Sequence, residues 1–110
     1  MKQIEYENIN YLIGENAQDN WDTLKKSKQN WIWFHLNNLA SPYVILCENI
    51  KKINKSDILN YIQYGCELCK ENSKYKNQKV QVIWTECKNI SLGSNIGEAI
   101  VKGKTNKMTI

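Results

Sequence analysis

Residues 31–36 (WIWFHL) place six large side chains in a row, and this run constrains the fold more than any other part of the chain. Aromatic and β-branched residues favour strands, and successive side chains of a strand point to opposite faces of a sheet. One face then carries Ile32, Phe34 and Leu36, and the other carries Trp31, Trp33 and His35. The apolar side chains of the first face are expected to lie in the hydrophobic core. The second must be covered by helices or lie partly open and bind a ligand.

Seven strands are predicted from runs of apolar, aromatic and β-branched residues. They cover residues 4–6, 9–13, 31–36, 43–47, 80–85, 98–102 and 107–110. The apolar parity switches across Glu7 and Asn8, which indicates a hairpin turn there because asparagine tolerates a left-handed backbone. The runs 31–36 and 43–47 are expected to pair as an antiparallel hairpin.

Two helices are predicted between these strands. The first is short, is capped by Asp19 or Asn20 and ends near Ser27. The second runs from residue 57 to residue 72, is capped by Ser56 and has one apolar face. Gly65 lies on that face, where glycine costs about 1 kcal/mol of helix stability relative to alanine. We therefore expect a close approach between this helix and the sheet.

The resulting order, ββαββαβββ, predicts an α+β fold. The simplest architecture is a single mixed, mainly antiparallel sheet packed with two helices. The chain has 110 residues and no internal repeat, so residues 1–110 are expected to form a single domain.

Several classes of function lack their sequence signatures. No apolar run approaches the roughly 18 residues of a membrane span, and the first residues lack the apolar region of a signal peptide. We therefore expect a cytoplasmic protein without membrane contact. The chain has no HExxH, GxSxG or phosphate-cradling glycine motif. We predict no enzyme and no cofactor, and a Cys/His enzyme that uses His35 is the alternative.

Cys66 and Cys69 have the CxxC spacing that is found in redox and zinc sites. They fall late in the second predicted helix, at positions that its apolar face needs, and a helix C-terminus does not lower a thiol pKa. Zinc would need further ligands from Cys47, Cys87 or His35, brought together by folding. We predict structural thiols and no metal, with zinc and redox chemistry as the alternatives.

All fifteen basic residues are lysine, and the net charge is +4. Most fall in four groups, within residues 25–28, 51–55, 70–79 and 102–107. A solvated face explains each group alone, and an A/T-rich genome explains part of the lysine content, whereas convergence on one side of the fold would indicate nucleic acid. Lysine lacks the planar fork with which arginine grips phosphate or guanine. Binding would therefore be electrostatic and sensitive to salt.

The motifs along the chain resemble the NFACT-R domain, the RNA-binding module of the NFACT proteins, and in particular its stand-alone form in coiled-coil domain-containing relatives. The most specific is the WFH core within IWFHL. The matching stretches are residues 14–16 (GEN), 19–22 (DNWD), 32–36 (IWFHL), 39–46 (LASPYVIL), 82–85 (VIWT) and 96–100 (IGEAI). The resemblance therefore covers nearly the whole chain.

The resemblance implies a non-enzymatic RNA-binding module that contacts tRNA or ribosomal RNA in ribosome-associated quality control. A ribosome or a protein is a further expected partner. On this hypothesis Asn16, Trp33 and His35 line the site. The phosphate contacts are Lys25, Lys26 and Lys28.

Several positions depart from the family pattern, including the surroundings of Cys47 and the loop that holds Ser91 and Leu92, where basic residues are common. Trp31 stands where an acidic residue is usual, Glu15 where a basic residue is usual, and Tyr43 where a second histidine is common. These departures and the aromatic side chains favour, as the alternative function, a protein-interaction module on the same fold.

Overall fold

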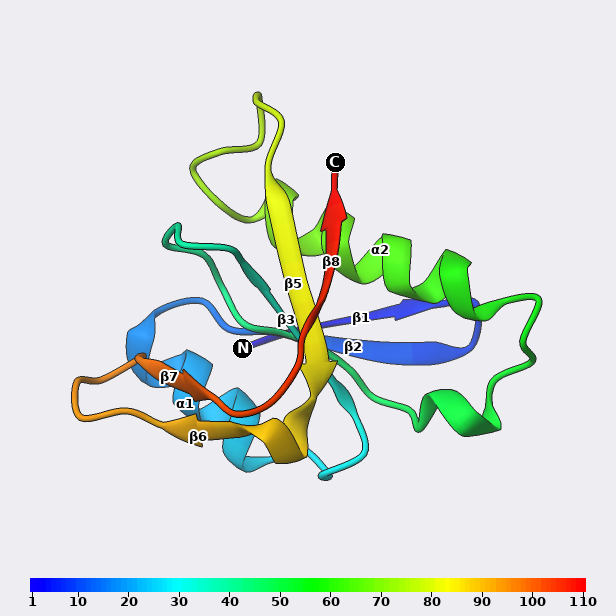
Figure 1. Cartoon of the computed structure of the whole chain (residues 1–110), viewed down its shortest axis with the longest axis horizontal. Coiled ribbons are helices and arrows are strands. Elements are labelled where there is room, and N and C mark those ends of the chain that lie inside the picture. Colours follow the sequence, from blue (N-terminus) through cyan, green and yellow to red (C-terminus); the bar gives the residue numbers. More distant parts are fainter.

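The computed structural model describes residues 1–110 as two helices packed on a mainly antiparallel sheet (Figure 1). The six-stranded sheet has the order β1-β2-β4-β3-β5-β8, and β6 and β7 form a separate two-stranded sheet. The strands are β1 (Lys2–Tyr6), β2 (Ile9–Ile13), β3 (Ile32–Leu36), β4 (Val44–Leu46), β5 (Gln81–Glu86), β6 (Ile90–Leu92), β7 (Ala99–Val101) and β8 (Asn106–Thr109). The helices are α1 (Ala17–Lys25) and α2 (Ile58–Glu71), with 3-10 helices η1 (Ile50–Lys52) and η2 (Cys87–Asn89).

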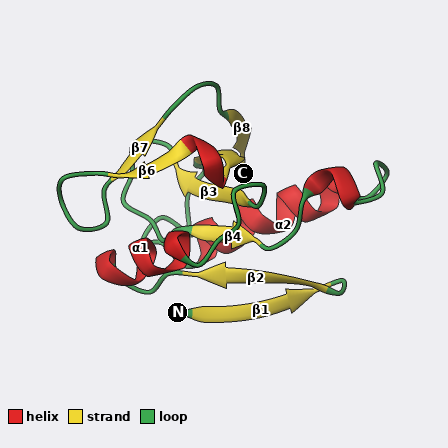
Figure 2. Cartoon of the chain, turned by 90° about the horizontal axis from the view of Figure 1, so that it is seen from below, coloured by secondary structure: helices red, strands yellow, loops and turns green.

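The predicted α+β class, with two helices and a mainly antiparallel sheet, is confirmed. The pairing of β3 with β4 is antiparallel as expected. The turn at Glu7 and Asn8 is also confirmed, since both residues have positive φ, 49° and 69°, as the primed hairpin turns require. Figure 2 shows the resulting β1–β2 hairpin at one edge of the molecule.

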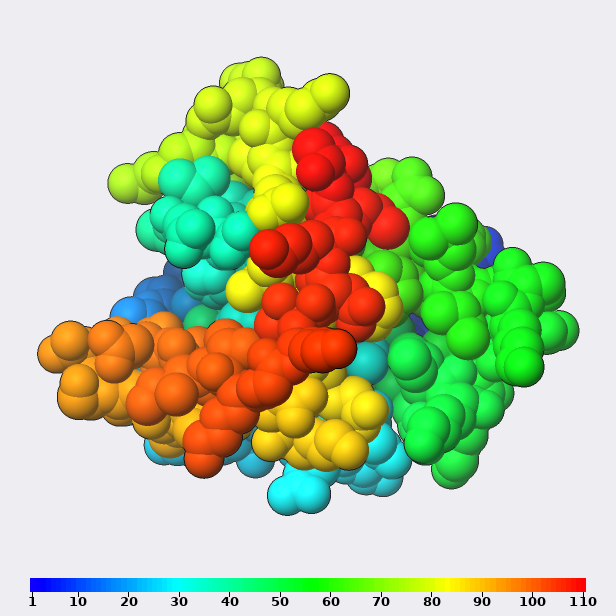
Figure 3. All heavy atoms as spheres, viewed as in Figure 1, coloured from blue at the N-terminus to red at the C-terminus, as the bar shows by residue number.

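Two details of the predicted order are wrong. The chain has one more strand than expected, because β6 was not predicted, and β7 pairs with β6 instead of joining the main sheet. Figure 3 shows this β6–β7 segment, in orange, projecting from one side of the molecule. Neither α1 nor α2 has the combination of length and hydrophobicity that a membrane-spanning helix needs.

The cap of α1 also differs from the prediction. Asn16 is the N-cap, and its Oδ1 accepts a hydrogen bond from the Asp19 N–H at 2.8 Å. Asn20, one of the two predicted caps, is instead buried, and its Oδ1 accepts the Tyr43 N–H at 3.0 Å. This bond attaches α1 to the start of β4. An asparagine side chain can accept either an N–H group of its own helix or an N–H group of a distant segment. The local sequence therefore did not show which asparagine caps the helix and which one bonds to Tyr43.

Helix α2 begins one residue later than predicted, with Asp57 as N-cap and no capping side-chain hydrogen bond from Asp57 or from Ser56. The close approach at Gly65 is confirmed. A Cβ on this residue would lie 2.4 Å from Cζ of Phe34 in β3. The missing side chain allows the helix to lie directly on the aromatic ring.

Replacing Gly65 with valine is expected to lower the free energy of unfolding by about 1–3 kcal/mol, because the core cannot accept the added atoms without shifting Phe34. Gln63→Val introduces the same side chain at an exposed position of the same helix. It should change stability by no more than about 0.5 kcal/mol. Urea unfolding of both variants checks this, and equal losses would contradict the packing argument.

The sheet separates two apolar clusters, as the alternation in β3 predicts. Ile32, Phe34 and Leu36 pack with α2 on one side. On the other side Trp33 belongs to a second cluster, which is covered by Trp21 and Leu24 of α1 and by residues of η2, β6 and β7. The face that carries the indoles is therefore covered, and the opening left at its end is where the candidate site lies.

Candidate nucleic-acid interface

A pocket of about 840 Å³, lined mostly by polar and charged residues, opens beside the N-terminus of α1. Five segments that are distant in sequence form it: the start of β1, the turn into α1, the end of β3 with the loop after it, the segment after α2, and the β6–β7 loop. The lining residues are Lys2, Gly14, Glu15, Asn16, Ala17, Asn20, His35, Ala40, Ser41, Pro42, Asn72, Ser73, Lys74, Ile96 and Gly97. The structure therefore brings together two of the predicted site residues, Asn16 and His35.

The ring of His35 is held on three sides. Nδ1 lies 2.7 Å from the backbone oxygen of Leu36. The ring stacks parallel on Trp33, with centroids 5.5 Å apart and planes inclined by 4°. It also meets the ring of Tyr43 edge-on at 5.8 Å. These contacts leave the imidazole one orientation, so it is organised before any ligand arrives.

The contacts of His35 also determine its protonation. Burial lowers its pKa below the ordinary value of 6.5, and the bond to the Leu36 carbonyl opposes this only partly. The ring is therefore neutral at pH 7. Since a carbonyl can only accept, Nδ1 carries the proton and Nε2 is the acceptor. Nε2 makes no hydrogen bond within the protein. The only fully buried side-chain nitrogen or oxygen without a partner is Nε1 of Trp33, so Nε2 of His35 must be at least partly accessible to solvent.

Asn16 lines the same pocket and is exposed. Its Oδ1 is occupied by the capping bond to Asp19. Its amide nitrogen makes no hydrogen bond within the protein and is free to donate. The same residue therefore fixes the start of α1 and offers a donor to a ligand.

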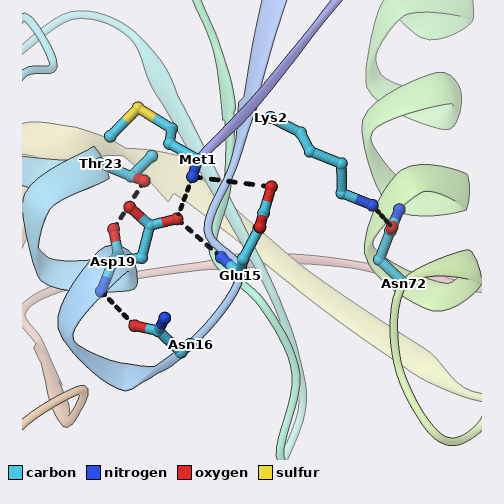
Figure 4. A network of polar contacts seen from close by, with 7 residues as sticks. All are labelled: Met1, Lys2, Glu15, Asn16, Asp19, Thr23 and Asn72. Atoms are coloured by element: carbon cyan, nitrogen blue, oxygen red, sulfur yellow. Dashed lines mark hydrogen bonds and ion pairs between the residues drawn. The ribbon is translucent and has the colours of Figure 1, made fainter.

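Two lysines supply positive charge at the pocket. Lys2 Nζ donates to Asn72 Oδ1 at 2.8 Å, which connects β1 to the end of α2 (Figure 4). Lys74 is exposed on the segment that follows. Glu15 is the one carboxylate in the lining, and it lies 3.6 Å from the amine of Met1. The side chains of the lining carry two positive charges and one negative charge.

Trp33 does not reach the surface. Its side chain is 1% exposed, packs edge-on against Tyr43 at 5.6 Å, and lies under His35. The sequence hypothesis placed it in the lining of the site, and the structure places it behind the lining. It offers no free face to a base in this structure, and it supports the histidine instead.

The three lysines expected to contact phosphate lie away from this pocket. Lys25, Lys26 and Lys28 are exposed at or beyond the C-terminal end of α1. Lys28 lines a second cavity of about 430 Å³, and its ammonium lies 6.0 Å from the Trp31 ring centroid. The charged residues of this cavity are Lys28, Lys51, Lys88 and Glu86. Lysines from two of the four groups, those in residues 25–28 and 51–55, therefore come together at this second cavity and not at the pocket beside His35.

The sequence reasoning missed Lys2 and did not single out Lys74. Lys2 is isolated in the sequence and gives no signal there. Lys74 belongs to a group of lysines, but only the fold shows which of them lies at the pocket. Lys88 is the one lysine with a carboxylate within 4.0 Å, Glu86 at 3.9 Å. The other fourteen of the fifteen lysines have no carboxylate within 4.0 Å, and the net charge of the chain is +4.

The cysteines show the environment of structural thiols. Cys66 and Cys69 are buried in α2, and burial raises the pKa of each to about 12. Burial also raises the pKa of Cys47 to about 11 and of Cys87 to about 12. The thiolate is the nucleophilic form, so all four are protonated and weakly reactive at neutral pH. No three His, Cys, Asp or Glu side chains come close enough together to hold a metal ion.

These features define a small α+β module with a polar pocket and a surface of unpaired lysines. Residues 3–107 match the family described as the NFACT protein RNA binding domain, and the chain belongs to this family. A search of the curated proteins found no match.

Among solved structures, the C-terminal part of the fibronectin/fibrinogen-binding protein from Streptococcus suis is similar, with a TM-score of 0.80 and 21% sequence identity. The match covers 98% of this chain and 43% of that chain, so this chain spans less than half of its length. At this identity the likeness shows the fold alone.

Proposed function

We propose that this chain is a non-enzymatic RNA-binding module and that the pocket at His35 holds the sugar–phosphate backbone of the RNA. Family membership supports RNA as the ligand. The observation that carries the proposal is the convergence of Lys2, Lys74 and the free amide of Asn16 on one pocket with His35. Ammonium and amide donors suit phosphate oxygens.

The chemistry of the pocket favours recognition of the backbone over recognition of the bases. The chain has no arginine for bidentate contacts to guanine. The lining includes no tryptophan, tyrosine or phenylalanine, and one face of His35 is already covered by Trp33. Bases in single strands are usually held by stacking on such rings. The surface therefore suits a structured RNA, such as tRNA or ribosomal RNA, that is recognised mainly through its shape and its sugar–phosphate backbone.

The biological setting belongs to the same proposal. Binding to tRNA or ribosomal RNA would place the protein in the cytoplasm, at or near the ribosome. The resemblance of the sequence to the NFACT-R domain supports a role in ribosome-associated quality control. Lys28, Lys51 and Lys88 would then provide a further contact to phosphate at the second cavity.

Binding of fluorescently labelled tRNA to the purified protein tests the proposal. We expect measurable binding at about 50 mM salt that weakens steeply toward about 200 mM, because the contacts are mainly to phosphate. A ribosomal RNA fragment and a polyanion such as heparin serve as comparison ligands. Absence of binding to either RNA at the lower salt concentration would contradict the proposal.

One observation favours a protein partner as the second candidate function. The segment from β6 to β7 exposes Leu92, Ile96, Ile100 and Val101, with exposed fractions of 37–60%. These residues lie on one hairpin and its loop, and exposed apolar side chains of this kind are available to a protein partner. A pulldown from nuclease-treated lysate distinguishes the candidates, because a partner that is retained after nuclease treatment favours protein interaction and a partner that is lost favours RNA.

A further inference from the structure

We infer that Nε2 of His35 accepts a hydrogen bond from a ribose 2′-hydroxyl, so that this pocket distinguishes RNA from DNA. The inference rests on the proposed function, since it assumes that a nucleic-acid backbone enters the pocket. It adds a specificity-determining residue and the atom that carries the specificity.

The first step is that the acceptor on His35 is fixed. Nδ1 is committed to the Leu36 carbonyl at 2.7 Å, and Trp33 and Tyr43 hold the plane of the ring. Rotation of the ring would break these contacts. Nε2 is therefore the ring nitrogen of this lining residue that remains open to a ligand, and it cannot exchange its role with Nδ1.

The second step is that every other neutral side-chain acceptor of the lining already accepts one hydrogen bond within the protein, although each of these oxygens has a second lone pair. They are Oδ1 of Asn16 from Asp19 N–H, Oδ1 of Asn20 from Tyr43 N–H, Oγ of Ser41 from Leu36 N–H, Oδ1 of Asn72 from Lys2, and Oγ of Ser73 from Tyr75 N–H. His35 Nε2 is the neutral side-chain acceptor that remains without a donor.

The third step compares the free groups of the pocket with those of a nucleic-acid backbone. The donors that remain are the Lys2 N–H groups not bonded to Asn72, the ammonium of Lys74 and the amide of Asn16. The one neutral side-chain acceptor without any hydrogen bond is His35 Nε2. A ribose-phosphate unit presents the complementary set, because its phosphate oxygens accept and its 2′-hydroxyl donates. A deoxyribose-phosphate unit has no donor to offer. The pocket lacks the free aromatic faces that would hold a base, so the sugar is favoured over a base amine.

The test uses three single-stranded oligonucleotides of one mixed sequence, with ribose, 2′-deoxyribose or 2′-fluororibose throughout. Fluorine at this position cannot donate a hydrogen bond. The wild-type protein is expected to bind the ribose form more tightly than either of the others, by a factor between about two and about ten, as one net hydrogen bond allows.

Two variants attribute that preference to His35. His35→Phe keeps a ring to stack on Trp33 but removes the acceptor, so it should bind all three oligonucleotides equally, at the wild-type affinity for the deoxy form. His35→Gln carries an amide oxygen that can accept, and it should retain part of the preference. Thermal unfolding of both variants identifies any loss of binding that is due to misfolding.

The outcomes separate the two levels of the proposal. If the wild-type protein binds none of the oligonucleotides and no tRNA, the proposed function fails. If it binds all three equally, the proposed function stands and the inference about His35 is overturned. A ribose preference that His35→Phe retains would overturn the inference as well. So would equal binding of the ribose and 2′-fluororibose forms by the wild-type protein, because fluorine cannot donate the hydrogen bond that the inference requires.

The same assignment predicts a dependence on pH. As pH falls through the lowered pKa of His35, Nε2 gains a proton and becomes a donor, so the preference for ribose should disappear while overall affinity for polyanions rises. The other charged groups at the pocket are Lys2, Lys74 and Glu15, and Tyr43, whose pKa burial raises to about 12, stays neutral. Measuring oligonucleotide binding from about pH 7.5 to about pH 5 tests this. In His35→Phe the ratio of the affinities for the ribose and deoxyribose forms should stay constant over this range.

Discussion

Replacing Trp33 with alanine is expected to lower the free energy of unfolding by about 3–5 kcal/mol, the range for removing a large aromatic side chain from a core. The indole is 1% exposed and fills the cluster between the sheet and α1. Its removal would also take away the surface on which His35 is stacked. Since small domains are stable by about 5–15 kcal/mol in total, this variant should be close to unfolding at 37 °C.

Urea unfolding measures the loss, with Trp31→Ala as the matched control. Trp31 is only half-buried at the edge of the same cluster, so its removal should cost clearly less. Trp33→Phe should also cost less than Trp33→Ala, because it keeps a ring and removes a buried N–H group that has no partner. A loss for Trp33→Ala no larger than that for Trp31→Ala would contradict the structural role assigned to Trp33.

The framework of the fold could be predicted because its signals are local. The two faces of β3, the primed turn at Glu7 and Asn8, and the close approach at Gly65 each depend on side chains within one element or one turn. Short elements were the exception. Strand β6 has three residues and directly follows η2, so it shows too little alternation to be recognised.

The site was harder to predict because it is assembled from distant segments. Lys2 and Asn72 form one contact across seventy positions of sequence, and neither is unusual in its local context. The burial of Trp33 depends on how α1, β6 and β7 cover its face. Alternation alone places Trp33 and His35 on the same side and cannot tell which of them reaches solvent. Asn16 could be named only because of the family resemblance, whereas His35 was singled out by the alternation of the strand as well.

Neutralising both pocket lysines, as Lys2→Gln with Lys74→Gln, is expected to weaken tRNA binding at about 50 mM salt by between tenfold and a hundredfold. Each phosphate contact contributes a slope of about 0.7 to the dependence of log affinity on log salt in single strands and about 0.9 in duplexes. Two lost contacts should therefore flatten that slope by about 1.4–1.8.

The matched control for the lysine pair is Lys102→Gln with Lys104→Gln, which removes the same charge from two exposed residues that do not line the pocket. If attraction depends only on net charge, both double variants should lose affinity equally. If the pocket beside α1 holds the backbone, the Lys2 and Lys74 pair should lose much more, and its slope should fall while that of the control changes little. Measuring affinity at four or more salt concentrations decides between the two, and equal slopes for the two double variants would contradict the placement of the RNA at His35.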